Sequence, residues 1–153
     1  MRREINIVRA NPASSDAQPL LEALWAFHQA RTPVEGQFWL GVEALSMPDI
    51  SFFLAYSDGQ AIGCAAYSTK YSELKSMFVT PQSRGTGAAH ALIEQVEHLA
   101  KAVGILRLET GPTHHSALKF YKKLGFTHCK GFGPYGDNDY SVCMAKTITK
   151  DTL

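Results

Sequence analysis

Apolar and polar residues alternate in several short runs of the chain, which is the pattern of a partly buried β-strand. Two of these runs flank Asp58-Gly59, a pair typical of a two-residue hairpin turn. Pro81 ends another run, because proline has no N–H group to donate to a sheet ladder. On this pattern, strands are predicted over residues 4–9, 52–56, 61–69, 73–79, 105–110, 126–130 and 140–147.

Other stretches repeat their apolar residues with helical spacing. The longest runs from about residue 86 to 103, where Ala88, Leu92 and Val96 share one stripe and Gly104 is placed to end the helix. Further helices are predicted from the N-cap candidates at residues 14–16 to Arg31, over residues 34–45 and over residues 114–124.

The order of these elements predicts how the strands pair. A helix crosses between the strands at 73–79 and 105–110, so these two strands are expected to run parallel. The strands between residues 52 and 79 are joined by short turns and are expected to be antiparallel. The sequence therefore predicts an α/β or α+β fold in a single domain of residues 1–153, with a mixed, mostly antiparallel sheet of six to seven strands and helices on both faces.

Composition narrows the function classes. The formal net charge is +1, whereas proteins that bind nucleic acid generally carry a large basic excess. Cys64, Cys129 and Cys143 lack the spacing of a metal site or a disulfide framework and are interpreted as reduced thiols inside the cell. The N-terminus does not resemble a signal peptide, and no run approaches the ~18 apolar residues of a membrane span. We therefore expect a cytoplasmic protein that binds neither nucleic acid nor membrane.

Small residues gather where the strand at 73–79 gives way to the long helix. Backbone without large side chains can bring several N–H groups to one ligand, and a helix N-terminus favours an anion. The loop is therefore a candidate phosphate site, although a glycine-rich turn without a ligand fits the same pattern. Its residues are Arg84, Gly85, Thr86, Gly87, Ala88 and Ala89.

Two blocks of the sequence resemble the GNAT superfamily of N-acetyltransferases. The first, residues 79–89 with the sequence VTPQSRGTGAA, is similar to the acyl-coenzyme A signature, whose core is matched by Arg84, Gly87 and Ala89. The second, residues 117–126 with the sequence ALKFYKKLGF, is similar to another conserved block of the superfamily. Both blocks fall on the expected elements in the expected order, so the resemblance covers most of the chain and implies a GNAT-like form of the predicted fold.

The resemblance implies acetyl-coenzyme A as co-substrate. In such proteins, the loop at 84–89 cradles the pyrophosphate, and the strand before it splays from its neighbour. The exposed backbone of Met77, Phe78 and Val79 is then expected to pair with the pantetheine arm. His114 stands where the superfamily often has asparagine and is expected to donate a hydrogen bond toward the cofactor. No metal is expected, because His114 and His115 are neighbours on a helix and point about 100° apart.

The resemblance also implies two catalytic residues. A lysine-like amine has a pKa of ~10.4, so only about one molecule in a thousand is neutral near pH 7, and a base is useful. Glu73 occupies a position where many members carry an acidic residue; a solvated carboxylate at a strand end is the alternative. Tyr121 matches the tyrosine that protonates the departing thiolate; a tyrosine of the core is the alternative.

These features favour an N-acetyltransferase that moves the acetyl group to a primary amine of a small molecule or a peptide N-terminus. Direct attack in a ternary complex is expected, because neither block contains a cysteine that could carry the acyl group. A non-catalytic acyl-coenzyme A sensor is an alternative. A dinucleotide-binding oxidoreductase is disfavoured, because the third glycine of that fingerprint is missing.

The acceptor is the least defined part of this prediction. Residues 28–39 and 132–139 are expected to wall its pocket, because loops carry specificity on a fixed scaffold. Glu35, Asp137 and Asp139 lie in these segments and indicate a small cationic amine. A homodimer is compatible with the sequence.

Overall fold

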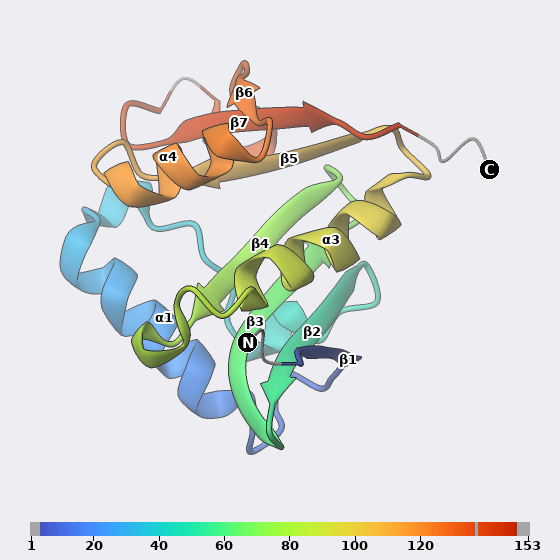
Figure 1. Cartoon of the computed structure of the whole chain (residues 1–153). Helices are drawn as coiled ribbons and strands as arrows, with labels where there is room; N and C mark the ends of the chain where they lie inside the picture. Colours follow the sequence, from blue (N-terminus) through green and yellow to red (C-terminus); the bar gives the residue numbers. More distant parts are fainter. Residues whose placement is uncertain (1–3, 137, 150–153) are drawn as a thin grey trace.

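A seven-stranded sheet forms the centre of the molecule, in the order β1-β2-β3-β4-β5-β7-β6 (Figure 1). The computed structural model describes residues 4–136 and 138–149. Each pairing between these strands is antiparallel except that of β4 with β5, which is parallel. This confirms the predicted mixed, mostly antiparallel sheet. The strands are β1 (Asn6–Arg9), β2 (Ile50–Ser57), β3 (Gln60–Ser68), β4 (Glu73–Val79), β5 (Ile105–Thr110), β6 (Thr127–His128) and β7 (Val142–Thr147).

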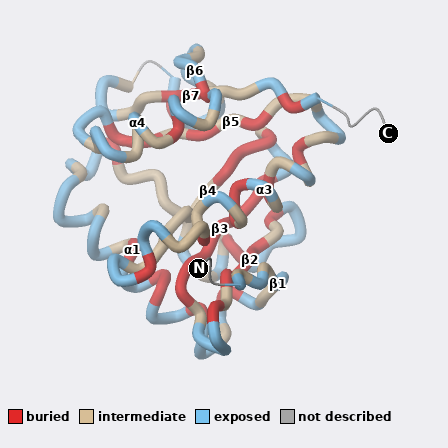
Figure 2. Tube along the Cα trace, viewed as in Figure 1, coloured by how far each residue is buried: buried red, intermediate tan, exposed pale blue. Residues whose placement is uncertain are grey.

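Helices pack on both faces of the sheet, as predicted. One core lies between the sheet and α3 and α4 and includes Leu92, Val96 and Tyr121, and the other lies under α1 and α2 and includes Leu21 and Leu45. Figure 2 shows burial concentrated along the central strands between these layers. None of the helices in the described ranges has the length and apolar character needed to cross a bilayer. The helices are α1 (Gln18–Arg31), α2 (Val42–Leu45), α3 (Ala88–Ala100) and α4 (His115–Lys123), with 3-10 turns at Val34–Gly36, Pro81–Ser83 and Gly133–Tyr135.

Two of the predicted helices start at the wrong residue. The helix α1 begins at Gln18 and not at residues 14–16, because Ser14 Oγ accepts the Ala17 N–H (3.3 Å) within a turn that precedes the helix. The helix α3 begins at Ala88 and not at residue 86, because Gly87 has a left-handed φ of +95° that ends the loop.

The prediction of one helix over residues 34–45 is wrong. A 3-10 turn and the short helix α2 are separated there by extended backbone, with Gly41 at ψ 177° before α2. The strand predicted at 126–130 shortens to β6 (Thr127–His128). The hairpin at Asp58-Gly59 is confirmed, and both residues have positive φ, as a tight primed turn requires.

The strand β4 separates from β5 almost at once. Their register contains the pair Glu73 opposite Arg107, and Figure 1 shows the two strands diverging toward their carboxyl ends. On the other edge of β4, a bulge shifts the pairing with β3 between Lys75 and Phe78, where Ser76 has a φ of +53°. Because β4 and β5 diverge after Glu73, the edge of β4 that faces β5 is unpaired beyond this residue. Such a splayed strand is what the resemblance to the superfamily predicts.

Candidate active site

A cavity of about 1010 Å³ opens where β4 and β5 separate. Its walls come from α1, β4, the loop before α3, β5 and the start of α4. The structure therefore brings residues that are far apart in the sequence to one cavity. All of the predicted site residues line it, namely Glu73, Met77, Phe78, Val79, Arg84, Gly85, Thr86, Gly87, Ala88, Ala89, His114 and Tyr121.

The loop that leads into α3 presents unpaired backbone N–H groups at this cavity. Within the described residues, the N–H groups of Gly85, Gly87, Ala88 and Ala89 have no acceptor in the chain. The two glycines have φ values of +83° and +95°, and a Cβ added to either would meet no atom within 4 Å. Unpaired N–H groups facing open space at a helix start form a site for an anion such as a pyrophosphate.

Glu73 lies at the start of β4 and is buried, with 3% of its surface exposed. The Tyr135 hydroxyl donates to Glu73 Oε2 at 2.5 Å, and Lys75 Nζ lies 3.6 Å from the same oxygen. Burial raises the pKa of Glu73, whereas the charge of Lys75 and the Tyr135 hydrogen bond lower it. The alternative of a solvated strand-end carboxylate is therefore wrong.

Lys75 links two loops to β4 through hydrogen bonds. Its ammonium donates to the Tyr135 hydroxyl (2.7 Å) and to the backbone carbonyl of Phe38 (3.1 Å). The two loops also contact each other, because Asn138 Nδ2 donates to the carbonyl of Glu35 (3.0 Å). Hydrogen bonds thus hold residues 34–38 together with Tyr135 and Asn138 beside the cavity.

A second carboxyl, Glu109 of β5, lies on the cavity wall. Ser141 Oγ donates to its Oε2 (2.7 Å), and burial raises its pKa while Ser141 and Lys75 lower it. Glu109 was not predicted as a site residue, although the sequence contains a signal for it. The predicted parallel pairing of the strands at 73–79 and 105–110 already places alternate residues of the second strand near Glu73.

Tyr121 lies on α4 with 9% of its surface exposed and lines the cavity. Its ring packs edge-to-face on Phe126, with centroids 5.7 Å apart, and belongs to the core under α3 and α4. Burial raises the pKa of its hydroxyl, so the proton stays on oxygen. Within the described residues, the hydroxyl has no hydrogen-bond partner, so it is free to donate to a bound group.

Imidazole and indole rings close the cavity beside α1. His28 stacks on His114, with centroids 5.2 Å apart, and on Trp39, at 5.9 Å. Burial, with His114 and Arg31 nearby, lowers the pKa of His28 to about 4, and burial and Arg31 also lower the pKa of His114. Both rings are therefore neutral near pH 7. His28 is packed against two other rings, and it is also part of the cavity wall.

The described part of residues 132–139 does not line the cavity, contrary to prediction. Tyr135 is buried at 1% exposure and is linked to the cavity wall through its hydrogen bonds with Glu73 and Lys75. Glu35 and Asp139 are exposed and away from the wall, and Asp137 lies outside the described residues. The acidic side chains on the wall are Glu73 and Glu109 instead.

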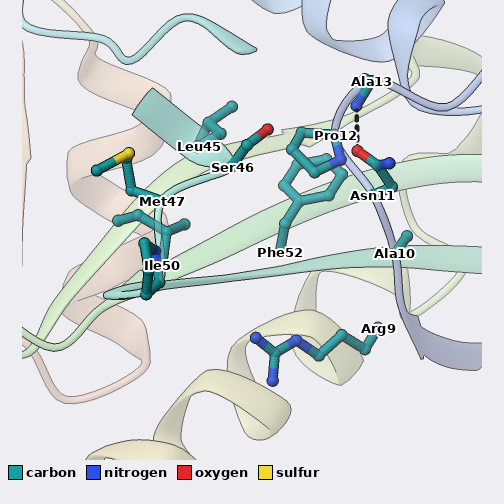
Figure 3. A pocket seen from close by; sticks show the side chains of 11 residues that line it. Arg9, Ala10, Asn11, Pro12, Ala13, Leu45, Ser46, Met47, Ile50 and Phe52 are labelled. Carbon is teal, nitrogen blue, oxygen red and sulfur yellow. Dashed lines mark hydrogen bonds between the residues drawn. The ribbon is translucent and has the colours of Figure 1, made fainter. Parts of the chain in front are cut away.

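A second hollow of about 480 Å³ lies between the end of β1 and the residues before β2 (Figure 3). Arg9 is the one ionisable residue on its described wall. Asn11 Oδ1 is already engaged by the N–H of Ala13 (2.9 Å), as Figure 3 shows. With no converging set of polar groups, this hollow does not compete with the larger cavity as a catalytic site.

Comparison with known proteins identifies the class of molecule to which this fold and cavity belong. The model of the Acetyltransferase (GNAT) family matches residues 16–126. A protein of Azospirillum brasilense named IAA acetyltransferase is 34% identical over 150 residues, covering 94% of this chain and 98% of the relative. The uncharacterized N-acetyltransferase YsnE of Bacillus subtilis (strain 168) is 32% identical over 124 residues, covering 76% and 82%.

Solved structures agree with this result. A protein of Klebsiella pneumoniae, provisionally described as an acyl-CoA N-acyltransferase, superposes with a TM-score of 0.76 at 26% identity, covering 94% of this chain and 97% of the other. The PaiA N-acetyltransferase of Thermoplasma acidophilum, solved in complex with coenzyme A, gives a TM-score of 0.67 over 94% and 99%; at 19% identity, it supports the fold alone.

The chain therefore belongs to the Acetyltransferase (GNAT) family. This confirms the family predicted from the two sequence blocks and makes the chain an acyl-coenzyme A-dependent N-acetyltransferase in general terms. Members of the family use acetyl-coenzyme A as co-substrate. The unpaired N–H groups before α3 and the open space in front of Gly85 and Gly87 fit its pyrophosphate.

The low pKa of His28 generates a prediction about stability. Because His28 has a folded pKa of about 4 against about 6.5 when unfolded, the unfolded chain binds more protons between these values. Stability is thus expected to fall as the pH drops from about 6.5 toward 4. His28→Phe keeps a stacked ring but removes this titration. Between pH 7.5 and 5, the free energy of unfolding of this variant should therefore fall by about 1–2 kcal/mol less than that of the parent protein.

Urea unfolding of both proteins at several pH values measures this difference. The values above pH 7.5 serve as the control, because the two curves should differ there by a constant. Parallel curves down to pH 5 would contradict the lowered pKa of His28 in the folded chain.

Proposed function

We propose that this protein transfers the acetyl group of acetyl-coenzyme A to a primary amine of a small molecule or peptide N-terminus, by direct attack with both substrates bound. One observation carries the proposal. A single cavity extends from the unpaired N–H groups before α3, along the open edge of β4, to a free tyrosine hydroxyl and two carboxyls. Acetyl-coenzyme A supplies the activated acetyl group.

The cofactor half of the cavity is assigned to the loop and β4. The N–H groups of residues 85 and 87–89 hold the pyrophosphate, and exposed Arg84 adds positive charge at its side. The backbone of Met77, Phe78 and Val79 has no strand on the β5 side, so its free N–H and C=O groups can pair with the pantetheine amides. A backbone N–H of this segment also stabilises negative charge that develops on the acyl oxygen. His114 contacts the cofactor from the start of α4.

The acceptor half is assigned to the carboxyls and the rings. Glu73 takes the proton from the acceptor ammonium, directly or through water, so that the neutral amine can attack the thioester carbonyl. Its raised pKa brings it nearer to that of a useful base at neutral pH. Glu109 attracts and orients the ammonium from β5. Phe38, Trp39 and His28 present ring surfaces to the remainder of the acceptor, which favours a small amine with an apolar or aromatic part.

Tyr121 is assigned to the leaving group. Its hydroxyl is protonated, unpartnered and on the cavity wall, so it can donate a hydrogen bond or proton to the departing sulfur. The absence of an acyl-carrier cysteine supports direct attack, because Cys64, Cys129 and Cys143 are all missing from the described wall. A non-catalytic acyl-coenzyme A sensor would keep the cofactor half but release no coenzyme A with any amine of a broad panel.

The cofactor assignment predicts the effect of a substitution in the loop. Gly87→Val adds a branched side chain at φ +95° in front of the unpaired N–H groups. The affinity for acetyl-coenzyme A should fall about 10- to 100-fold, the value of about one charge-assisted hydrogen bond. Calorimetry on folded protein measures it. Gly104→Val is the matched control, because Gly104 has φ +91° and equally open surroundings at the other end of α3. Equal affinities in the two variants would contradict the loop assignment.

The leaving-group assignment predicts that Tyr121→Phe lowers kcat by about 10²- to 10⁴-fold, because general acid help is lost while ring and packing stay. Affinity for acetyl-coenzyme A and Tm should change little, since the hydroxyl has no partner within the described chain. Steady-state release of coenzyme A gives the rate, with single-turnover kinetics to verify that chemistry is limiting. A mutant that retains the parent rate under that condition would make Tyr121 a residue of the core.

The two carboxyls can be separated by paired substitutions. Glu73→Gln should lower kcat about 10²- to 10⁴-fold and remove its contribution to the acidic limb of the pH–rate profile. Glu109→Gln should mainly raise the KM for the amine, because it orients and does not take the proton. A Tm measurement accompanies both, since Glu73→Gln deprives the partly buried Lys75 of its ion pair. If Glu109→Gln abolishes turnover and Glu73→Gln does not, the base is on β5.

A further inference from the structure

Two cysteines lie opposite each other on neighbouring antiparallel strands. The ladder of β6 and β7 pairs Thr127 with Ala145 and His128 with Met144, so the next pair along it is Cys129 and Cys143. The N–H of Cys129 donates to the carbonyl of Cys143 (2.9 Å), which shows that the ladder continues to this pair. Both are free thiols.

The geometry of this pair suits a covalent bridge. Residues directly opposite in a hydrogen-bonded antiparallel pair have Cα atoms about 5.5 Å apart, and their side chains project from the same face of the sheet. Disulfides generally join Cα atoms about 4.4–6.8 Å apart, so a bridge needs no large backbone movement. Cys129 is partly exposed at the sheet edge, whereas Cys143 is buried at 6% exposure.

The surroundings set how the thiols react. Burial raises the pKa of both, Arg107 lowers that of Cys129, and the neighbouring carboxylates of Glu109 and Glu73 raise that of Cys143 further. Cys129 is therefore the thiol that meets a dissolved oxidant first. Cys64 is isolated from this pair, because it is fully buried and its Sγ donates to the carbonyl of Ser76 (3.3 Å).

We propose that Cys129 and Cys143 form a reversible redox site that a hydroperoxide converts to an intramolecular disulfide. The Cys129 thiolate attacks one peroxide oxygen, the O–O bond breaks, and Cys129 becomes a sulfenic acid as an alcohol or water leaves. Cys143 Sγ then attacks the Cys129 sulfur and its oxygen leaves as water. Two thiols and one peroxide give one disulfide, one alcohol or water and one water. Reduction by a dithiol reverses the step.

The bridge would close the loop that carries Tyr135. Residues 130–142 lie between the two cysteines, and Tyr135 within them donates to Glu73. In addition, Cys143 lies directly opposite Glu109 in the β5–β7 ladder. The redox site is therefore adjacent to the cavity, yet its formation does not depend on the proposed reaction, so it is tested without any acetyltransferase assay.

The full chain is treated with hydrogen peroxide at pH 8, quenched with excess iodoacetamide under denaturing conditions and weighed intact. The expected product is a monomer with one alkylated cysteine instead of three, and dithiothreitol should restore three. Trypsin cuts between Lys130 and Gly131, so the peptides 124–130 and 131–146 should be recovered as one disulfide-linked species.

Cys64→Ala is the matched control and should still form the bridge, leaving no alkylated cysteine. Cys129→Ser should keep both of its remaining thiols alkylatable under the same treatment, without the folding risk of substituting buried Cys143. Three results would overturn the proposal: a disulfide between two chains, oxidation of Cys129 to a sulfinic acid without the linked peptides, or a bridge that includes Cys64.

Discussion

The separation of β4 from β5 is the constraint on which the rest of this structure depends. Parallel neighbours normally share a full ladder, but these two share the pair Glu73 and Arg107 and then diverge. The bulge at Ser76 bends β4 while its pairing with β3 continues. As a result, a strand in the middle of the sheet has one free edge, and the cavity opens there without disturbing either hydrophobic core.

Beside the free edge, a network of hydrogen bonds and one ion pair holds two loops against β4. Lys75, Tyr135 and Glu73 are hydrogen-bonded or ion-paired with one another and have little exposed surface. Lys75 also donates to the carbonyl of Phe38. A buried charge without partners would cost several kcal/mol, so the network is stable only when both loops are in place. Its geometry therefore holds the loops and a carboxyl on the wall in one arrangement.

Sequence patterns were sufficient for the sheet order of the central strands and for the family, because hairpin turns, a crossover helix and a small-residue loop are local features. They failed where long-range contacts decide the conformation. Tyr135 lies in a turn-rich segment that reads as an exposed loop, yet it is buried by partners about sixty residues away, such as Glu73. Glu109 was missed although the predicted parallel pairing placed it near Glu73, because its exposure on a cavity wall depends also on the divergence of the two strands.

The contact between the segments at 34–38 and 138–140 has a consequence for how this protein can diversify. Asn138 holds the carbonyl of Glu35, and Gly36 lies so close to Tyr140 that a Cβ on it would approach the Tyr140 Cβ to 2.7 Å. Neither segment can change its path without the other. New acceptor preferences would therefore arise through paired changes in two distant parts of the gene, or through single changes on α1, whose cavity-facing side chains are free of this linkage.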